Sequence, residues 1–124
     1  RLDQARAYPT EFVEAMTEAG LLGVLIPEAY GGSGLGLTAA CAVLEEVHAS
    51  GGNAAALHAQ IYTMGTVLRH GGAEQKAEWL PKIADGSVRL QAFGVTEPTA
   101  GSDTTSLTTF ARRDGDRYIV NGQK

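Results

Sequence analysis

The sequence predicts an α+β chain in which an all-helical domain, residues 1–86, precedes the first strands of an antiparallel β-domain, residues 87–124. Three observations lead to this prediction. Apolar residues recur at helical spacing in the first part of the chain, glycine pairs separate the periodic segments, and strand-like runs with an Asp-Gly turn follow Gly86. Because the helices come first and the strands afterwards, we expect two packed units rather than an alternating α/β fold.

The helical part is expected to contain several separate helices. Thr38 and Asn53 are expected N-caps, because their side chains can accept hydrogen bonds from the first turn. Gly20 is expected to end the first helix in a left-handed conformation. Pro81 marks a possible break within the last helix. The expected helices span residues 9–20, 38–50, 53–70 and 73–80, the last with a possible continuation after Pro81 to residue 84.

The β-part is expected to contain three strands. Residues 90–95, 107–111 and 117–120 are short runs rich in apolar and β-branched side chains. Asp114-Gly115 lies between the last two runs and is a strong signal for a hairpin turn.

Composition excludes several function classes. The chain has 124 residues, 10 basic and 14 acidic side chains and a net charge of −4, so it lacks the basic surface that nucleic-acid binding requires. Its 3 histidines and single cysteine, Cys41, show no metal-ligand spacing and offer no intramolecular disulfide. No apolar run approaches the roughly 18 residues of a membrane span. With no signal-peptide pattern at its start, the chain is expected to be a cytoplasmic fragment.

Residues 93–106 carry the clearest chemical signal. Here a strand-like run ends in Thr96-Glu97-Pro98, and a loop rich in small and hydroxyl side chains follows. Gly101 lets the backbone approach a ligand closely, and successive N–H groups in such a loop can bind an anion. Thr96 and Ser102 offer hydrogen-bond donors and acceptors on either side of the loop. The residues alone leave two readings open, namely a site for a phosphate-bearing or polar-ring ligand and a tight loop without a ligand.

Residues 94–103, GVTEPTAGSD, closely resemble the signature of acyl-CoA dehydrogenases. The resemblance covers nearly the whole chain and implies the three-domain fold of that family, of which this chain holds the helical domain and the start of the β-barrel domain. It also implies a flavoprotein oxidoreductase that uses FAD to α,β-dehydrogenate an acyl-CoA thioester. Further segments resemble the family in the expected order, over residues 23–34, 71–76, 79–86 and 114–124.

The resemblance implies a role in FAD binding for several residues. Phe93 and Val95 are expected to line the isoalloxazine ring, and Thr96 to hydrogen-bond its pyrimidine edge, where negative charge gathers on reduction. Gly101 and Ser102 are expected at the flavin pyrophosphate. Ser102 is also expected near the acyl-CoA substrate.

The resemblance implies no catalytic residue and no metal ligand in this chain. The family's base is a glutamate of a C-terminal helical domain, so the chain is expected to be a truncated piece that is inactive alone. Glu97 and Asp103 are expected to hold the loop through local hydrogen bonds, as acidic side chains in turns do. His58 or Thr63 is a candidate contact for the acyl end of the substrate, with a packing or surface role as the alternative for His58.

The implied partners are an acyl-CoA substrate, an electron-transfer flavoprotein as electron acceptor, and further copies of the full-length protein in a dimer or tetramer. Two alternatives stay open. One is an acyl-CoA oxidase, a nitroalkane oxidase or a flavin monooxygenase on the same scaffold, which differ mainly in reactivity with oxygen. The other is a non-catalytic helical interaction module that retains a degenerate flavin motif. Acyl chain length and branching are not read from these residues, because the pocket draws on several helices.

Overall fold

The computed structural model describes residues 2–5 and 7–124, which form two compact units. The helical unit ends at Ala92, and the hairpin unit runs from Phe93 to Lys124. Helices are followed by an antiparallel strand pair, so the predicted α+β class is confirmed. The predicted domain boundary after residue 86 stays a prediction.

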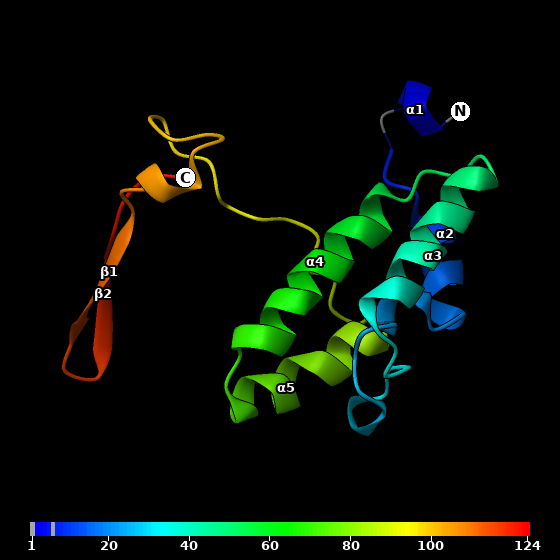
Figure 1. Ribbon diagram of the computed structural model, residues 1–124, viewed down its shortest axis with the longest axis horizontal. Coiled ribbons are helices and arrows are strands. Elements are labelled where there is room, and N and C mark those ends of the chain that lie inside the picture. The colour runs from blue at the N-terminus through cyan, green and yellow to red at the C-terminus, as the bar shows by residue number, and fades with distance from the viewer. Residues whose placement is uncertain (1, 6) are drawn as a thin grey trace. The chain divides into compact units, whose positions relative to one another are not determined.

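The helical unit contains the helices that apolar periodicity predicts. Gly20 adopts the expected left-handed conformation with φ of 74°. Asn53 Oδ1 accepts a hydrogen bond of 2.9 Å from the N–H of Ala55, but the N-cap of that helix is Ala54, so the predicted N-cap lies one residue too early. Pro81 does not interrupt the last helix. The α-helices are α1 (Leu2–Ala5), α2 (Thr10–Glu18), α3 (Leu37–Ala49), α4 (Ala55–His70) and α5 (Ala73–Ala84), with 3₁₀ turns at Leu21–Gly23 and Glu28–Tyr30 (Figure 1).

The predicted N-cap of α3 is wrong. The helix begins at Leu37 after the extended residue Gly36, so Thr38 lies within the first turn. No side chain caps this end. Glycine is an acceptable N-cap because its backbone leaves the first N–H groups of the helix open to solvent. In a sequence, however, a glycine indicates a helix start less strongly than a serine or threonine does.

The core of the helical unit is built around α4. Leu57, Ile61 and Met64 lie on one stripe of this helix and are buried. They belong to two apolar clusters, one shared with the loop before α3 and with α5, the other with α2. Burying one such side chain contributes about 1.5–3 kcal/mol, so these clusters account for most of the stability of this unit. The other buried members are Val13, Leu22, Val24, Ile26, Ala40, Val47, Ala54, Leu80 and Ile83.

One glycine is required by this packing. A Cβ at Gly32 would overlap the backbone carbonyl and the side chain of Ile26. The turn after Glu28–Tyr30 can therefore approach the core this closely only with glycine at this position.

The hairpin unit contains the predicted hairpin. Strand β1 (Phe110–Asp114) pairs antiparallel with β2 (Arg117–Asn121), and Asp114 lies opposite Arg117. Gly115, in the two-residue turn, has φ of 60°, which is the left-handed region that an Asp-Gly turn supplies. Every residue of both strands is exposed, so this pair has no apolar core of its own.

Two predicted strand positions are wrong. Residues 90–95 form no strand, because a strand exists only through hydrogen bonds to a neighbour, and β1 and β2 pair with each other in the described part of the chain. The strand expected from residue 107 begins later, at Phe110, because the preceding residues form a 3₁₀ turn, Thr104–Ser106.

No helix within the described ranges, residues 2–5 and 7–124, combines the length and the apolarity needed to cross a bilayer.

Candidate functional site

The loop predicted to bind a ligand is closed by its own backbone. The N–H of Glu97 donates to the carbonyl of Ala100 at 2.9 Å, and the N–H of Ala100 donates to the carbonyl of Glu97 at 3.2 Å. Pro98 and Thr99 therefore form the tip of a tight turn. Ala100, which closes the turn, is buried, and Gly101 and Ser102 follow it directly in the chain.

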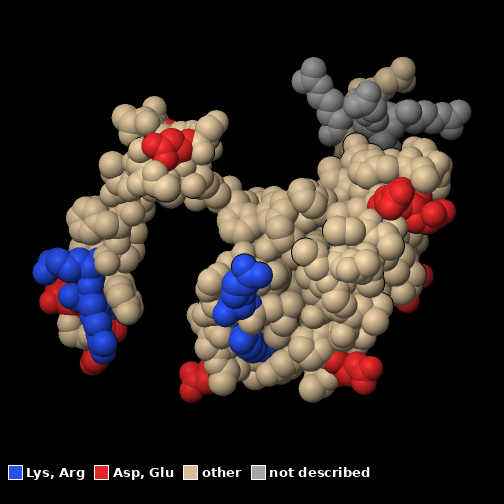
Figure 2. All heavy atoms as spheres, viewed as in Figure 1, with Lys and Arg blue, Asp and Glu red and all other residues tan. Residues whose placement is uncertain are grey.

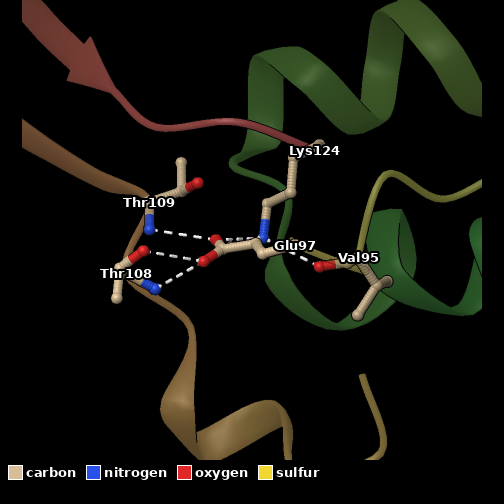
Figure 3. A network of polar contacts seen from close by, with 5 residues as sticks. All are labelled: Val95, Glu97, Thr108, Thr109 and Lys124. Atoms are coloured by element: carbon tan, nitrogen blue, oxygen red, sulfur yellow. Dashed lines mark hydrogen bonds and ion pairs between the residues drawn. The ribbon is translucent and has the colours of Figure 1, made fainter. Parts of the chain in front are cut away.

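The carboxylate of Glu97 connects this turn to the beginning of the hairpin. The residue as a whole is 5% exposed, and its carboxylate accepts hydrogen bonds from both the N–H and the hydroxyl of Thr108, at 2.7 and 2.9 Å. The N–H of Thr109 donates to the other oxygen at 2.9 Å (Figure 3). A buried carboxylate with this many donors is an anchor for the backbone.

Lys124 completes the anchor from the far end of the hairpin unit. Its Nζ lies 2.9 Å from Glu97 Oε1 and donates to the carbonyl of Val95 at 3.0 Å (Figure 3). The ammonium therefore contacts the residues directly before and after Thr96. The sequence offers no local signal for this contact, because 29 positions separate Lys124 from Val95.

The electrostatics of the anchor make Glu97 a weak base. Hydrogen bonding at Thr109, then the N–H of Thr108 and the ammonium of Lys124, hold the pKa of Glu97 far below the usual range of a glutamate. The carboxylate is therefore ionised at neutral pH and its oxygens are occupied by protein donors. The backbone hydrogen bonds predicted for Glu97 are confirmed.

Asp103 has the local role that the sequence predicts. Its carboxylate caps the 3₁₀ turn by accepting a 3.1 Å hydrogen bond from the N–H of Thr105, and it also accepts from the hydroxyls of Thr105 and Ser106. The Ser106 hydroxyl, followed by Thr105, lowers the pKa of Asp103. Asp103 therefore shapes the segment that leads from the loop into β1.

The residues predicted to bind FAD lie on both sides of this anchored turn. Val95 is half-buried and its carbonyl is engaged by Lys124, while Phe93 is 47% exposed. Thr96 and Ser102 are exposed, and in the described ranges their hydroxyl and N–H groups form no hydrogen bond. A Cβ at Gly101 would meet no atom within 4 Å.

This donor set fits a flavin. A threonine hydroxyl and N–H are suited to the polar edge of the ring, and the open backbone at Gly101 and Ser102 is suited to a diphosphate. The anchor leaves these donors free because Glu97 draws its own hydrogen bonds from Thr108 and Thr109 instead. Among the described residues no cluster of His, Cys, Asp or Glu is arranged to hold a metal ion. The individual roles of the five predicted residues stay predictions.

The helical unit contains a separate apolar groove of about 680 Å³. His58 and Tyr62 of α4 both line it, and their rings meet edge to face with centroids 5.2 Å apart. Thr63 does not line the groove, and its hydroxyl donates to the carbonyl of Ala59 at 2.9 Å. Much of the remaining lining is apolar and comes from α3 and α4, namely Leu37, Ala40, Leu44, Ile61 and Leu68.

Charged side chains are distributed differently over the two units. Figure 2 shows basic side chains gathered over the hairpin, with acidic ones beside them. Most of the surface in view on the helical unit is uncharged (Figure 2). The basic residues of the strands are Arg112, Arg113 and Arg117.

Known proteins resemble the chain over nearly its whole length. The family model described as "Acyl-CoA dehydrogenase, N-terminal domain" matches residues 1–87. Acyl-CoA dehydrogenase FadE12 of Mycobacterium tuberculosis is 42% identical over 126 residues, which is 99% of this chain and 32% of the relative. The chain thus spans about a third of the length of the curated relatives it matches.

Solved structures show the same likeness. The crystal structure of acyl-CoA dehydrogenase from Geobacillus kaustophilus has a TM-score of 0.74 and 35% identity, covering 93% of this chain and 30% of that one. The prolyl acyl carrier protein oxidase AnaB has a TM-score of 0.73 and 32% identity, covering 93% and 31%.

Proposed function

Because this chain belongs to the acyl-CoA dehydrogenase family, we propose that it supplies the helical domain and the first part of the FAD-binding domain of an enzyme that α,β-dehydrogenates an acyl-CoA thioester. When bound, FAD would supply the acceptor for the hydride that leaves the β-carbon of the substrate. The proposal assigns to this chain the binding and orientation of FAD and substrate, but no proton transfer.

The hairpin unit provides the FAD contacts in this proposal. Thr96 donates to the pyrimidine edge of the ring, which favours the reduced form because that edge gains negative charge. Phe93 and Val95 lie along the ring, and Gly101 and Ser102 donate N–H groups to the pyrophosphate. Glu97 and its partners hold this loop in place without occupying the free donors.

The helical unit provides a wall for the acyl end of the substrate. Its groove is mostly apolar and contains His58 and Tyr62, which matches the lining expected for an acyl chain. Ser102 is assigned to the thioester end, near the CoA.

Several parts of the proposal concern the whole protein rather than this chain. The base that removes the α-proton belongs to a C-terminal helical domain, by analogy with the family. An electron-transfer flavoprotein takes the electrons, and the full-length protein assembles as a dimer or tetramer. A cytoplasmic location, expected from the composition, remains part of the same proposal.

One observation carries the proposal. The anchored turn leaves Thr96, Gly101 and Ser102 open to a ligand, in a chain that matches the family from end to end. The test is the visible absorption spectrum of the full-length protein, followed by anaerobic titration with acyl-CoAs of increasing chain length. Bound flavin that is bleached by one chain-length class supports the proposal. A colourless protein that does not take up FAD favours the non-catalytic interaction module instead.

A second candidate is an oxidase on the same scaffold. The likeness to AnaB, an acyl carrier protein oxidase, supports it with identity similar to that of the Geobacillus dehydrogenase. The rate at which oxygen reoxidises the substrate-reduced protein separates the two. Slow reoxidation indicates a dehydrogenase, and reoxidation as fast as turnover indicates an oxidase.

A further inference from the structure

Lys124 holds the backbone on both sides of Thr96. Its ammonium donates to the Val95 carbonyl at 3.0 Å and lies 2.9 Å from Glu97 Oε1. The lysine side chain is 32% exposed and the glutamate side chain 2%. The ammonium is thus kept at one place by two fixed acceptors, one of which is a peptide carbonyl.

The contact with Val95 reaches Thr96 through a single peptide group. The Val95 carbonyl and the Thr96 N–H belong to the same planar, resonance-stabilised unit. A cation on the carbonyl oxygen withdraws electron density from the nitrogen, and hydrogen bonds polarise one another along such a chain. Thr96 N–H therefore becomes a stronger donor, and it has no acceptor within the described ranges.

The carboxylate of Glu97 does not cancel this effect. Its negative charge is shared among donors from Thr108 and Thr109 as well as Lys124. The ammonium, in contrast, touches the Val95 oxygen directly. Removing the ammonium would end the polarisation of the Val95–Thr96 peptide and would also leave the negative charge of Glu97 without its cationic partner. Both changes disfavour additional negative charge near Thr96.

We infer that Lys124 is a positioning residue for the flavin proposed at Thr96, and that it favours the reduced ring by polarising the Val95–Thr96 peptide. This inference rests on the proposed function. It assigns a redox-tuning role to a residue that touches neither flavin nor substrate in the proposal.

The test is the midpoint potential of FAD in the full-length protein, measured by spectroelectrochemistry. Lys124→Gln keeps an N–H donor but removes the charge, so reduced FAD should lose about fivefold to tenfold in affinity relative to oxidised FAD. For a two-electron couple a tenfold change corresponds to about 30 mV, here toward more negative potential. Lys124→Arg keeps the charge and should stay within about twofold of the wild type. Lys82→Gln, in the helical unit, is the matched control and should leave the potential unchanged.

Each outcome supports or overturns either the role of Lys124 or the proposed function. An unchanged potential in Lys124→Gln with FAD bound overturns the inference and leaves the proposed function standing. If Lys124→Gln does not retain FAD, the potential of Lys124→Arg decides. A change near tenfold in the relative affinity for reduced FAD, despite the conserved charge, contradicts a role for the charge. A change within twofold supports that role. A wild-type protein without FAD overturns the proposed function and the inference together.

Discussion

Each unit of the chain contains one lysine–glutamate ion pair among its described residues, and the two pairs differ in burial and surroundings. In the helical unit Lys82 and Glu78 lie one turn apart on α5, 3.4 Å from each other, with side chains 45% and 56% exposed. In the hairpin unit Lys124 and Glu97 lie 2.9 Å apart, and the glutamate side chain is 2% exposed. The first pair lies on the exposed surface of one helix, whereas the second connects the loop around Thr96 to Lys124.

This difference reflects how each unit is stabilised. The helical unit buries two apolar clusters, and its charged groups stay outside them. In the hairpin unit every residue of both strands is exposed, and the unit is organised around the buried carboxylate of Glu97. The hydrophobic effect does not depend on the direction of a contact, whereas a hydrogen-bonded carboxylate holds each of its donor groups at a defined position. The unit that carries the candidate site is therefore the one held by directed polar contacts.

The largest effect is expected from the helical core. Leu57 is fully buried on α4, so Leu57→Ala should destabilise this unit by about 2–5 kcal/mol through lost burial and the cavity left behind. Hydrogen exchange of the α4 amides in the full-length protein measures the change. Leu37→Ala, at a position 66% exposed, is the control and should change it by less than about 0.5 kcal/mol. Similar losses for the two variants would contradict an apolar core centred on α4.

A smaller, local effect is expected from a glycine of the hairpin unit. Gly122 has φ of 153°, and a Cβ there would overlap the side chain of Thr109, next to the Glu97 anchor. Gly122→Ala should cost about 1–3 kcal/mol through strain and overpacking, with loss of amide protection at Thr108 and Thr109 but not in α4.

The matched control separates folding from binding. Gly101→Ala adds a methyl where no atom lies within 4 Å, so protection of the hairpin unit should stay unchanged. If Gly101 lies at the flavin pyrophosphate as proposed, FAD affinity should still fall by roughly tenfold or more. Unchanged FAD affinity would remove Gly101 from the proposed site.

Local signals in the sequence predicted most of this architecture. Apolar periodicity places the helices, and Asp114-Gly115 places the hairpin turn, because both depend on neighbouring residues. Residues 90–95 look like a strand but form none, since pairing depends on a partner that the run itself does not contain.

The parts of the candidate site that depend on neighbouring residues could also be predicted from the sequence. The signature around Thr96 marks the loop, and the backbone-holding role of Glu97 follows from acidic residues in turns. Lys124 carries no local signal for its contact with Val95, because the two meet only after the whole hairpin has formed. Long-range polar contacts of this kind become visible only in the structure.

Acid should affect the hairpin unit before the helical unit. The pKa of folded Glu97 lies below its ordinary value of about 4.5, so the stabilisation from its ionised form is complete above that pH. It should be lost progressively as the pH falls below 4.5 toward the folded pKa, because the unfolded state then binds the proton more readily. Hydrogen exchange at Thr108 and Thr109, followed from pH 6 down to about pH 3 and corrected for intrinsic rates, measures this slope.

Glu97→Gln is the control for the acid response. This variant cannot ionise at the anchor, so its hairpin unit should be less protected at neutral pH and should lose the part of the slope that belongs to Glu97. A slope as steep as that of the wild type would assign the acid response to other groups, of which Asp103 is the first candidate because its pKa is also lowered.

The smallest effect is expected from the exposed ion pair. Lys82→Gln removes the partner of Glu78 at 3.4 Å, and because both side chains are about half exposed, solvent and salt screen their attraction. The change in stability of α5 should be about 0.3–0.5 kcal/mol at low salt and should fade as the ionic strength rises. The ammonium of Lys82 also lies 5.0 Å from the centre of the Trp79 ring, so Lys82→Arg, which keeps the charge for both contacts, should restore what is lost. A loss well above 1 kcal/mol would show that the helical unit, too, depends on a directed polar contact, and the contrast between the two units would then fail.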